Sequence, residues 1–141
     1  MPMNPPVFLC ALTFAAFCGG GLLAQEVTPG SDAAIDVPSG QMVSLLDVIH
    51  NEPGPVGLTL RFRFLAPAIA DAVAFETAVA DMAFLCDAYV LPRIAEFGPT
   101  PEQIIISFAD RAIPFGQAAP DAVQFFESYR IENGTCQWEM F

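Results

Sequence analysis

The segment of residues 58–65 has the clearest pattern in the chain, because apolar and polar residues alternate in it as far as Phe64. The apolar positions are Leu58, Leu60, Phe62 and Phe64, and the polar positions between them are Thr59, Arg61 and Arg63. A period of two sends the two sets to opposite faces of a strand. The run predicts a strand with one face on a core and the other on water, which is typical of an antiparallel sheet.

A second pattern, with apolar residues three or four positions apart, predicts a helix over residues 71–90. Its apolar stripe consists of Phe75, Val79, Met82, Cys86 and Tyr89. Asp71 can cap the start of this helix, and Pro92 favours an end at residue 90. Cys86 lies on the stripe, so it is expected to face a sheet.

Two more apolar runs predict strands at residues 42–50 and 103–109. The first contains Ser44, which could also open a short helix. The second is rich in β-branched residues and is typical of a buried strand. Residues 51–57 and 110–120 contain several prolines and glycines, which predict a loop and a connection with tight turns.

The C-terminal residues carry a strong hairpin signal, Asn133-Gly134 between two apolar-polar runs. A two-residue turn there places Ile131 opposite Cys136 and Tyr129 opposite Trp138, with all four on one face. The polar residues fall on the other face, and this clean separation supports the register. Cys136 is therefore expected to point toward the core.

Together these elements predict a two-layer α+β domain at residues 41–141. It has an antiparallel sheet of four or five strands, with the helix of residues 71–90 packed across one face. Residues 25–40 are rich in Pro, Gly, Ser and Asp and predict an irregular lead-in.

Residues 1–24 are predicted to be a signal peptide, since residues 7–24 form an uncharged apolar run that ends in small residues. The usual positive charge at the start is missing, because residues 1–6 contain neither Lys nor Arg. An uncleaved N-terminal anchor and a cytoplasmic protein are the alternatives. Cleavage after Ala24 predicts a periplasmic or secreted domain without a membrane segment.

Cys10 and Cys18 lie in the predicted leader, which leaves Cys86 and Cys136 in the mature chain. An even number of cysteines in an exported domain predicts a disulfide. The pairing also follows from the predicted layers, because the helix stripe and the inner face of the hairpin have to cover each other.

The formal net charge of −11 reflects 16 acidic residues against five basic ones, all of them arginine. A chain this acidic repels nucleic acid and anionic lipid, so we expect neither as a partner. Solubility explains the charge; an acidic surface for a basic partner is the alternative.

The sequence presents no catalytic constellation, metal-ligand spacing or cofactor motif, so we expect no cofactor and lean against an enzyme. His50 is the only histidine, and a lone histidine at a strand end is expected to be structural. Carboxylate pairs such as Asp81 with Asp87 and Glu127 with Glu139 are expected to be solvated surface.

The polar face of the predicted sheet holds the most informative side chains. Arg61, Arg63 and Arg130 share it with Glu132, Gln137 and Glu139. Cross-strand charge pairing is one interpretation. The other is a ligand or partner surface made of Arg61, Arg63, Arg130, Gln137 and Glu139, because arginine grips carboxylates with two prongs. Phe115 is either an exposed loop aromatic or a plug at the edge of the core.

Four segments, residues 61–67, 80–86, 106–116 and 124–139, resemble a family of small exported bacterial proteins catalogued as a domain of unknown function. The resemblance implies no catalytic residues. Some relatives carry an acetolactate synthase label, but that enzyme is a much longer chain with a thiamine diphosphate site, and this chain has no such motif.

The leading hypothesis is therefore an exported, non-enzymatic domain that binds a protein partner or a small ligand through its open polar sheet face. A structural or envelope-assembly accessory protein and an enzyme of unrecognised type are the alternatives.

Overall fold

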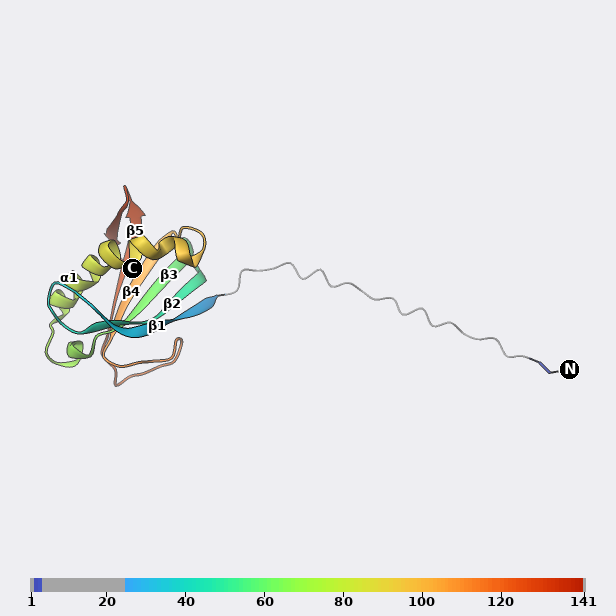
Figure 1. The fold of residues 1–141 in the computed structure, drawn as a ribbon, viewed down its shortest axis with the longest axis horizontal. Helices are drawn as coiled ribbons and strands as arrows, with labels where there is room; N and C mark the ends of the chain where they lie inside the picture. Colours follow the sequence, from blue (N-terminus) through green and yellow to red (C-terminus); the bar gives the residue numbers. More distant parts are fainter. Residues whose placement is uncertain (1, 4–24, 141) are drawn as a thin grey trace.

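The computed structural model describes residues 2–3 and 25–140, and within them a six-stranded sheet carries a helical layer on one face (Figure 1). The strands follow chain order across the sheet: β1 (Glu26–Ile35), β2 (Val43–Gly54), β3 (Gly57–Leu65), β4 (Gln103–Ala109), β5 (Gln124–Glu132) and β6 (Thr135–Glu139). The predicted α+β class is confirmed, but the expected count of four or five strands is wrong. Nearly all of the predicted signal peptide lies outside the described residues.

The additional strand is β1, in the segment predicted to be an irregular lead-in. It pairs antiparallel with β2, from Glu26 opposite His50 to Ile35 opposite Val43. Pro29 is tolerated because β1 is an edge strand whose outer N–H groups need no partner. Gly30 is required by close approach, since a Cβ there would lie 1.9 Å from the backbone oxygen of Leu45.

The predicted loop at residues 51–57 is also wrong, because β2 and β3 run on to Gly54 and Gly57, which face each other as the last pair of the hairpin. A break in register between Ile49 and Glu52 marks a bulge, where Asn51 has a positive φ of 56°. Pro53 fits in β2 because the pairing with β1 reaches no further than Glu26 opposite His50, so within the described residues no strand on that side meets its missing N–H.

The sheet is mixed, which corrects the expectation of an antiparallel sheet. β3 and β4 are parallel, from Thr59 opposite Gln103 to Leu65 opposite Ala109, while all other neighbours are antiparallel. The connection between them contains the whole helical layer. A crossover of this length returns the chain to the end of the sheet where β3 began, so β4 runs the same way.

The long helix starts later and ends later than the predicted range of residues 71–90. After a 3-10 helix η1 (Pro67–Ala70), the α-helix α1 (Phe75–Leu85) continues into a π-helical stretch η2 (Cys86–Val90) and a 3-10 helix η3 (Leu91–Phe97). Asp71 is not its cap; Ala74 precedes α1. Pro92 does not end the helical path, because a proline in the first turn of η3 has no N–H to satisfy. No helix in the described residues has the length and apolar character that crossing a bilayer needs.

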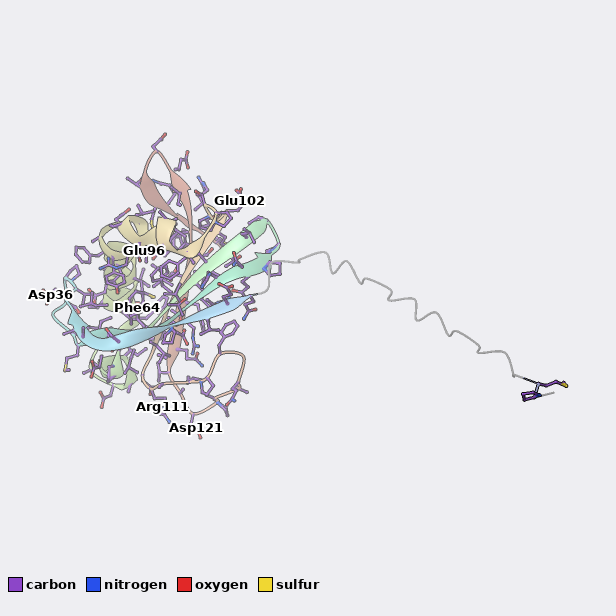
Figure 2. The ribbon with its side chains drawn as sticks, turned by 45° about the vertical axis from the view of Figure 1, so that its right-hand side comes forward. Asp36, Phe64, Glu96, Glu102, Arg111 and Asp121 are labelled. Carbon is purple, nitrogen blue, oxygen red and sulfur yellow. A yellow bond between two sulfur atoms is a disulfide. The ribbon has the colours of Figure 1, made fainter. Side chains whose placement is uncertain are left out.

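The core lies between this layer and the inner face of the sheet, as the alternation in residues 58–65 predicts. Phe62 and Phe64 of β3 are fully buried, together with Phe108 of β4 and Met82 of α1. The ring of Tyr89 meets those of Phe62 and Phe64 edge to face at 6.3 and 5.7 Å. Figure 2 labels Phe64 in this position.

The β5–β6 hairpin has the predicted register, with Ile131 opposite Cys136 and Tyr129 opposite Trp138. The predicted disulfide is confirmed: Cys86 and Cys136 are bonded, with 6.1 Å between their Cα atoms. The Cys136 N–H also donates to Oδ1 of Asp87 at 2.9 Å. The hairpin is thus tied twice to the helical layer.

Candidate functional site

The connection between β4 and β5, residues 110–123, folds over the outer face of the sheet, opposite the helical layer. Figure 2 shows Arg111 and Asp121 on this loop, across the sheet from Glu96 of η3. The carbonyl of Ile113 accepts a hydrogen bond from Nη2 of Arg63. The loop therefore covers part of the face that the alternation in β3 predicts to be open to water.

The two ends of this loop are fastened together where they leave the sheet. The Asp110 N–H donates to the Val123 carbonyl at 3.1 Å, and the Val123 N–H donates to Oδ1 of Asp110 at 3.2 Å. Arg111 donates to Asp110 and to the carbonyl of Asp121. The Arg111 hydrogen bond holds the pKa of Asp110 below its usual range. The loop is therefore an organised part of the fold.

Between this loop and the sheet lies a hollow of about 230 Å³. Its walls come from β3, β4, β5 and the loop and include Arg61, Arg63, Ser107, Phe115, Gln117 and Phe126. None of the residues that line it is acidic, although the chain has 16 acidic residues and only five basic ones. The hollow is therefore a positively lined site on a strongly negative protein.

Arg63 anchors the loop and has little freedom to bind anything else. The residue is only 8% exposed, its Nη1 donates to Oδ2 of Asp47 at 2.9 Å, and its Nη2 donates to Ile113. Burial raises the pKa of Asp47, and the neighbouring Arg63 charge offsets part of this effect. Burial also lowers the pKa of Arg63, and Asp47 opposes that shift. The pair holds loop and sheet together.

Arg61 is less committed than Arg63. Its Nε lies 3.4 Å from Oε2 of Glu52, and its side chain is 19% exposed. Within the described residues its two Nη atoms make no hydrogen bond, so their N–H groups can donate to a ligand in the hollow. The Phe115 ring lies under both arginines, 5.7 Å from Cζ of Arg61 and 5.5 Å from Cζ of Arg63. These cation–π contacts hold the two guanidinium groups side by side.

The other predicted site residues share the outer face but lie away from the hollow. Arg130 pairs with Glu132 on its own strand at 2.7 Å and is exposed, and Gln137 donates to Thr135 at 3.0 Å. Glu139 of β6 lies opposite Ser128 of β5. The structure brings Arg61 and Arg63 together, and leaves Arg130, Gln137 and Glu139 on the hairpin.

The sequence reasoning missed Gln117, Gln124 and Phe126 as part of this site. They come from the loop and from β5, and only the fold of the loop brings them beside β3. Phe115 was the one residue of the loop whose sequence context pointed to the site, because it is an aromatic residue between Pro114 and Gly116 in a polar loop. It is half-buried against the two arginines on the outer face, so it is neither a free loop aromatic nor a plug at the edge of the core.

Two of the carboxylates expected on the solvated surface are buried and hold neighbouring segments together through hydrogen bonds, which corrects that expectation. Asp81 of α1, 1% exposed, accepts hydrogen bonds from the Ser39 N–H and hydroxyl at 3.0 and 2.5 Å, and from the Gln41 amide at 2.7 Å. Glu127 of β5 is buried and accepts a hydrogen bond from the indole N–H of Trp138. Both are structural.

His50 joins strands β1 and β2. Its Nε2 lies 3.0 Å from the Thr28 hydroxyl, its Nδ1 lies 3.5 Å from the Glu26 carboxylate, and its ring meets that of Phe97 edge to face. Nowhere in residues 25–140 do three or more His, Cys, Asp or Glu side chains gather as a metal site would require.

A comparison with protein-family models matches residues 18–141 to a family of unknown function, DUF6497. The same chain has no match among the curated proteins or among the solved structures.

Proposed function

This chain belongs to DUF6497, a family of unknown function, and we propose that it is an exported, non-enzymatic domain that binds a ligand or a protein partner at the outer face of its sheet. The observation that carries the proposal is the hollow beneath residues 110–123. It is lined by two arginines and no carboxylate, and it has a defined wall because the loop is fastened at both ends.

Export is supported by two independent features. The Cys86–Cys136 disulfide is the kind of bond that persists in oxidising compartments. The apolar run at residues 7–24 has the composition of a signal sequence. Together they favour the periplasm or the extracellular medium as the place where the domain works.

Export is tested by expressing the full chain, with its own N-terminus, in a Gram-negative host and measuring the intact mass of the periplasmic protein without reductant. The expected mass is that of a chain beginning at Gln25 and lacking two hydrogens. A chain confined to the cytoplasm with two free thiols contradicts this part of the proposal.

Binding is tested by hydrogen–deuterium exchange of the purified protein, with and without the small-molecule and protein fractions of the host periplasm. We expect slower exchange at residues 59–63, 113–117 and 124–126. Arg61→Gln should abolish the effect, while Arg130→Gln, which changes an exposed arginine of the same face outside the hollow, should preserve it. Absence of protection, or equal protection in Arg61→Gln, overturns binding at this site.

A further inference from the structure

The charge of the hollow decides the sign of its ligand. The Asp47 carboxylate, which neutralises Arg63, sits beside that arginine and does not line the hollow; Glu52 stands in the same relation to Arg61. A ligand in the hollow therefore meets the guanidinium groups and neutral side chains, and no negative group. This arrangement favours an anion, because guanidinium N–H groups donate hydrogen bonds and have no acceptor for a cation.

The geometry of the two arginines favours one class of anion, namely an anion with a single planar charged group. Arg63 uses one N–H of each outer nitrogen, for Asp47 and for the Ile113 carbonyl, and the residue is only 8% exposed. Neither outer nitrogen of Arg61 has a hydrogen-bond partner among the described residues, so Arg61 is the arginine that can present two adjacent N–H donors to a ligand. A planar pair of N–H donors matches the two oxygens of a carboxylate, which accepts both hydrogen bonds in parallel. The remaining polar groups, on Ser107, Gln117 and Gln124, are neutral and add no charge for a second anionic group.

The rest of the lining gives the ligand an apolar part. Ile113, Pro114, Phe115 and Phe126 line the hollow together with the polar groups, and Phe126 is 43% exposed in spite of its size. The volume of about 230 Å³ corresponds to about eight water molecules at about 30 Å³ each. A small molecule fits this space, and a folded segment of polypeptide does not.

Resting on the proposed function, we propose that the hollow binds a small organic monocarboxylate, with the carboxylate on the free prongs of Arg61 and an apolar tail against Phe126. Arg63 and Phe115 are positioning residues that hold the Arg61 guanidinium in place. Gln117 and Gln124 donate to the oxygens that Arg61 leaves unsatisfied.

The inference is tested by NMR titration of the oxidised protein with acetate, hexanoate and benzoate, against hexanamide, benzamide and inorganic phosphate. We expect hexanoate and benzoate to shift the amides of Gly116, Gln117 and Phe126 and to bind at least about tenfold more tightly than their amides, because the amide lacks the charge that Arg61 grips. Acetate should bind more weakly than hexanoate, since it has no tail for Phe126.

Three variants locate the contact. Arg61→Gln should weaken hexanoate binding by about 10–100-fold through loss of two charge-assisted hydrogen bonds. Arg61→Lys keeps the charge but loses the fork, and should recover only a small part of the affinity. Phe126→Ser should remove the preference for hexanoate over acetate and leave acetate binding in place. Arg130→Gln is the matched control and should bind like the natural chain. The amide spectra report whether each variant is folded.

The outcomes separate this inference from the proposed function. Equal binding of carboxylates and amides, tighter binding of phosphate, or full affinity in Arg61→Gln overturns the carboxylate site. If the periplasmic fractions still protect residues 113–117 in an Arg61-dependent way, the outer face binds something else and the proposed function stands. If neither the carboxylates nor the periplasmic fractions affect the residues of the hollow, both the carboxylate site and the proposed function are wrong.

Discussion

Buried polar side chains show how individual residues depart from their usual places in this protein. Asp81 and Glu127 are buried, and each is hydrogen-bonded to a group from another segment. Tyr129 differs, since its hydroxyl is buried and has no partner among the described residues. A buried hydroxyl without a partner costs stability.

We expect Tyr129→Phe to leave the free energy of unfolding unchanged or to raise it by about 1 kcal/mol, because it removes that unsatisfied group. The substitution also has a pH signature. Burial, followed by the charges of Glu127 and Asp87, raises the pKa of Tyr129. The folded state therefore holds this proton more tightly than the unfolded state does, so Tyr129 adds no pH dependence to the stability below about pH 10 and lowers the stability progressively as the pH rises above that value.

Urea unfolding at pH 7 and at about pH 11 checks both points. The alkaline loss of stability should be smaller in Tyr129→Phe than in the natural chain. Tyr89→Phe is the matched control, because the Tyr89 hydroxyl is not among the buried unpaired groups. An unfolding free energy that falls by 2 kcal/mol or more at pH 7, on the scale of a lost buried hydrogen bond, contradicts the assignment.

At the scale of elements, the disulfide and the hairpin act as one unit. Cys86 begins η2 and Cys136 lies in β6, 50 residues later in the chain. Among the described residues β6 lies at the edge of the sheet and pairs with β5 alone, and its further contacts come from the helical layer. The bond restricts the unfolded chain as well as holding the hairpin.

We expect the double variant Cys86→Ala with Cys136→Ala to lose about 4 kcal/mol of unfolding free energy, from the entropy of closing a loop of this length. Denaturant unfolding of the variant and of the natural chain measures the loss. Reduced natural protein is the control, because it lacks the bond but keeps both sulfur atoms in the core. A loss below about 1 kcal/mol in both would show that the hairpin is held by its other contacts alone.

Elements specified by local pattern could be predicted, and those that depend on distant partners could not. The β5–β6 hairpin needs only Asn133-Gly134 and the alternation beside it, so its register was evident. β1 was missed because Pro29 and Gly30 argue against a strand unless it lies at an edge. The parallel pairing of β3 with β4 depends on where the crossover returns the chain, and no local pattern records that.

At the scale of the whole molecule, charge is the dominant feature. Four of the five arginines already pair with a carboxylate within the described residues: Arg61, Arg63, Arg111 and Arg130. Most of the 16 acidic residues therefore have no arginine partner, and the chain keeps a large excess of negative charge. Self-repulsion of this kind weakens the compact state.

Raising the ionic strength from about 10 mM to about 150 mM shortens the screening length from about 30 to about 8 Å. We expect the melting temperature to rise over this range, because screening relieves long-range repulsion more than it weakens the short, partly buried pairs. Thermal unfolding followed by circular dichroism measures it, with the salt series repeated near the pI of about 4.1 as a control, where the effect should vanish. A lower melting temperature at 150 mM would show that the ion pairs outweigh the repulsion.

The sequence by itself determined the α+β class, the inner face of β3, the hairpin register and the disulfide, because each follows from short-range periodicity or from the chemistry of two cysteines. It also placed Arg61 and Arg63 on one face. Only the tertiary structure decided what that face became. The loop of residues 110–123 folds over the sheet, buries Arg63 against Asp47 and Ile113, and leaves Arg61 with two free donors over a hollow. Burial and hydrogen bonding depend on which distant segments meet, so two arginines alike in the sequence differ in role.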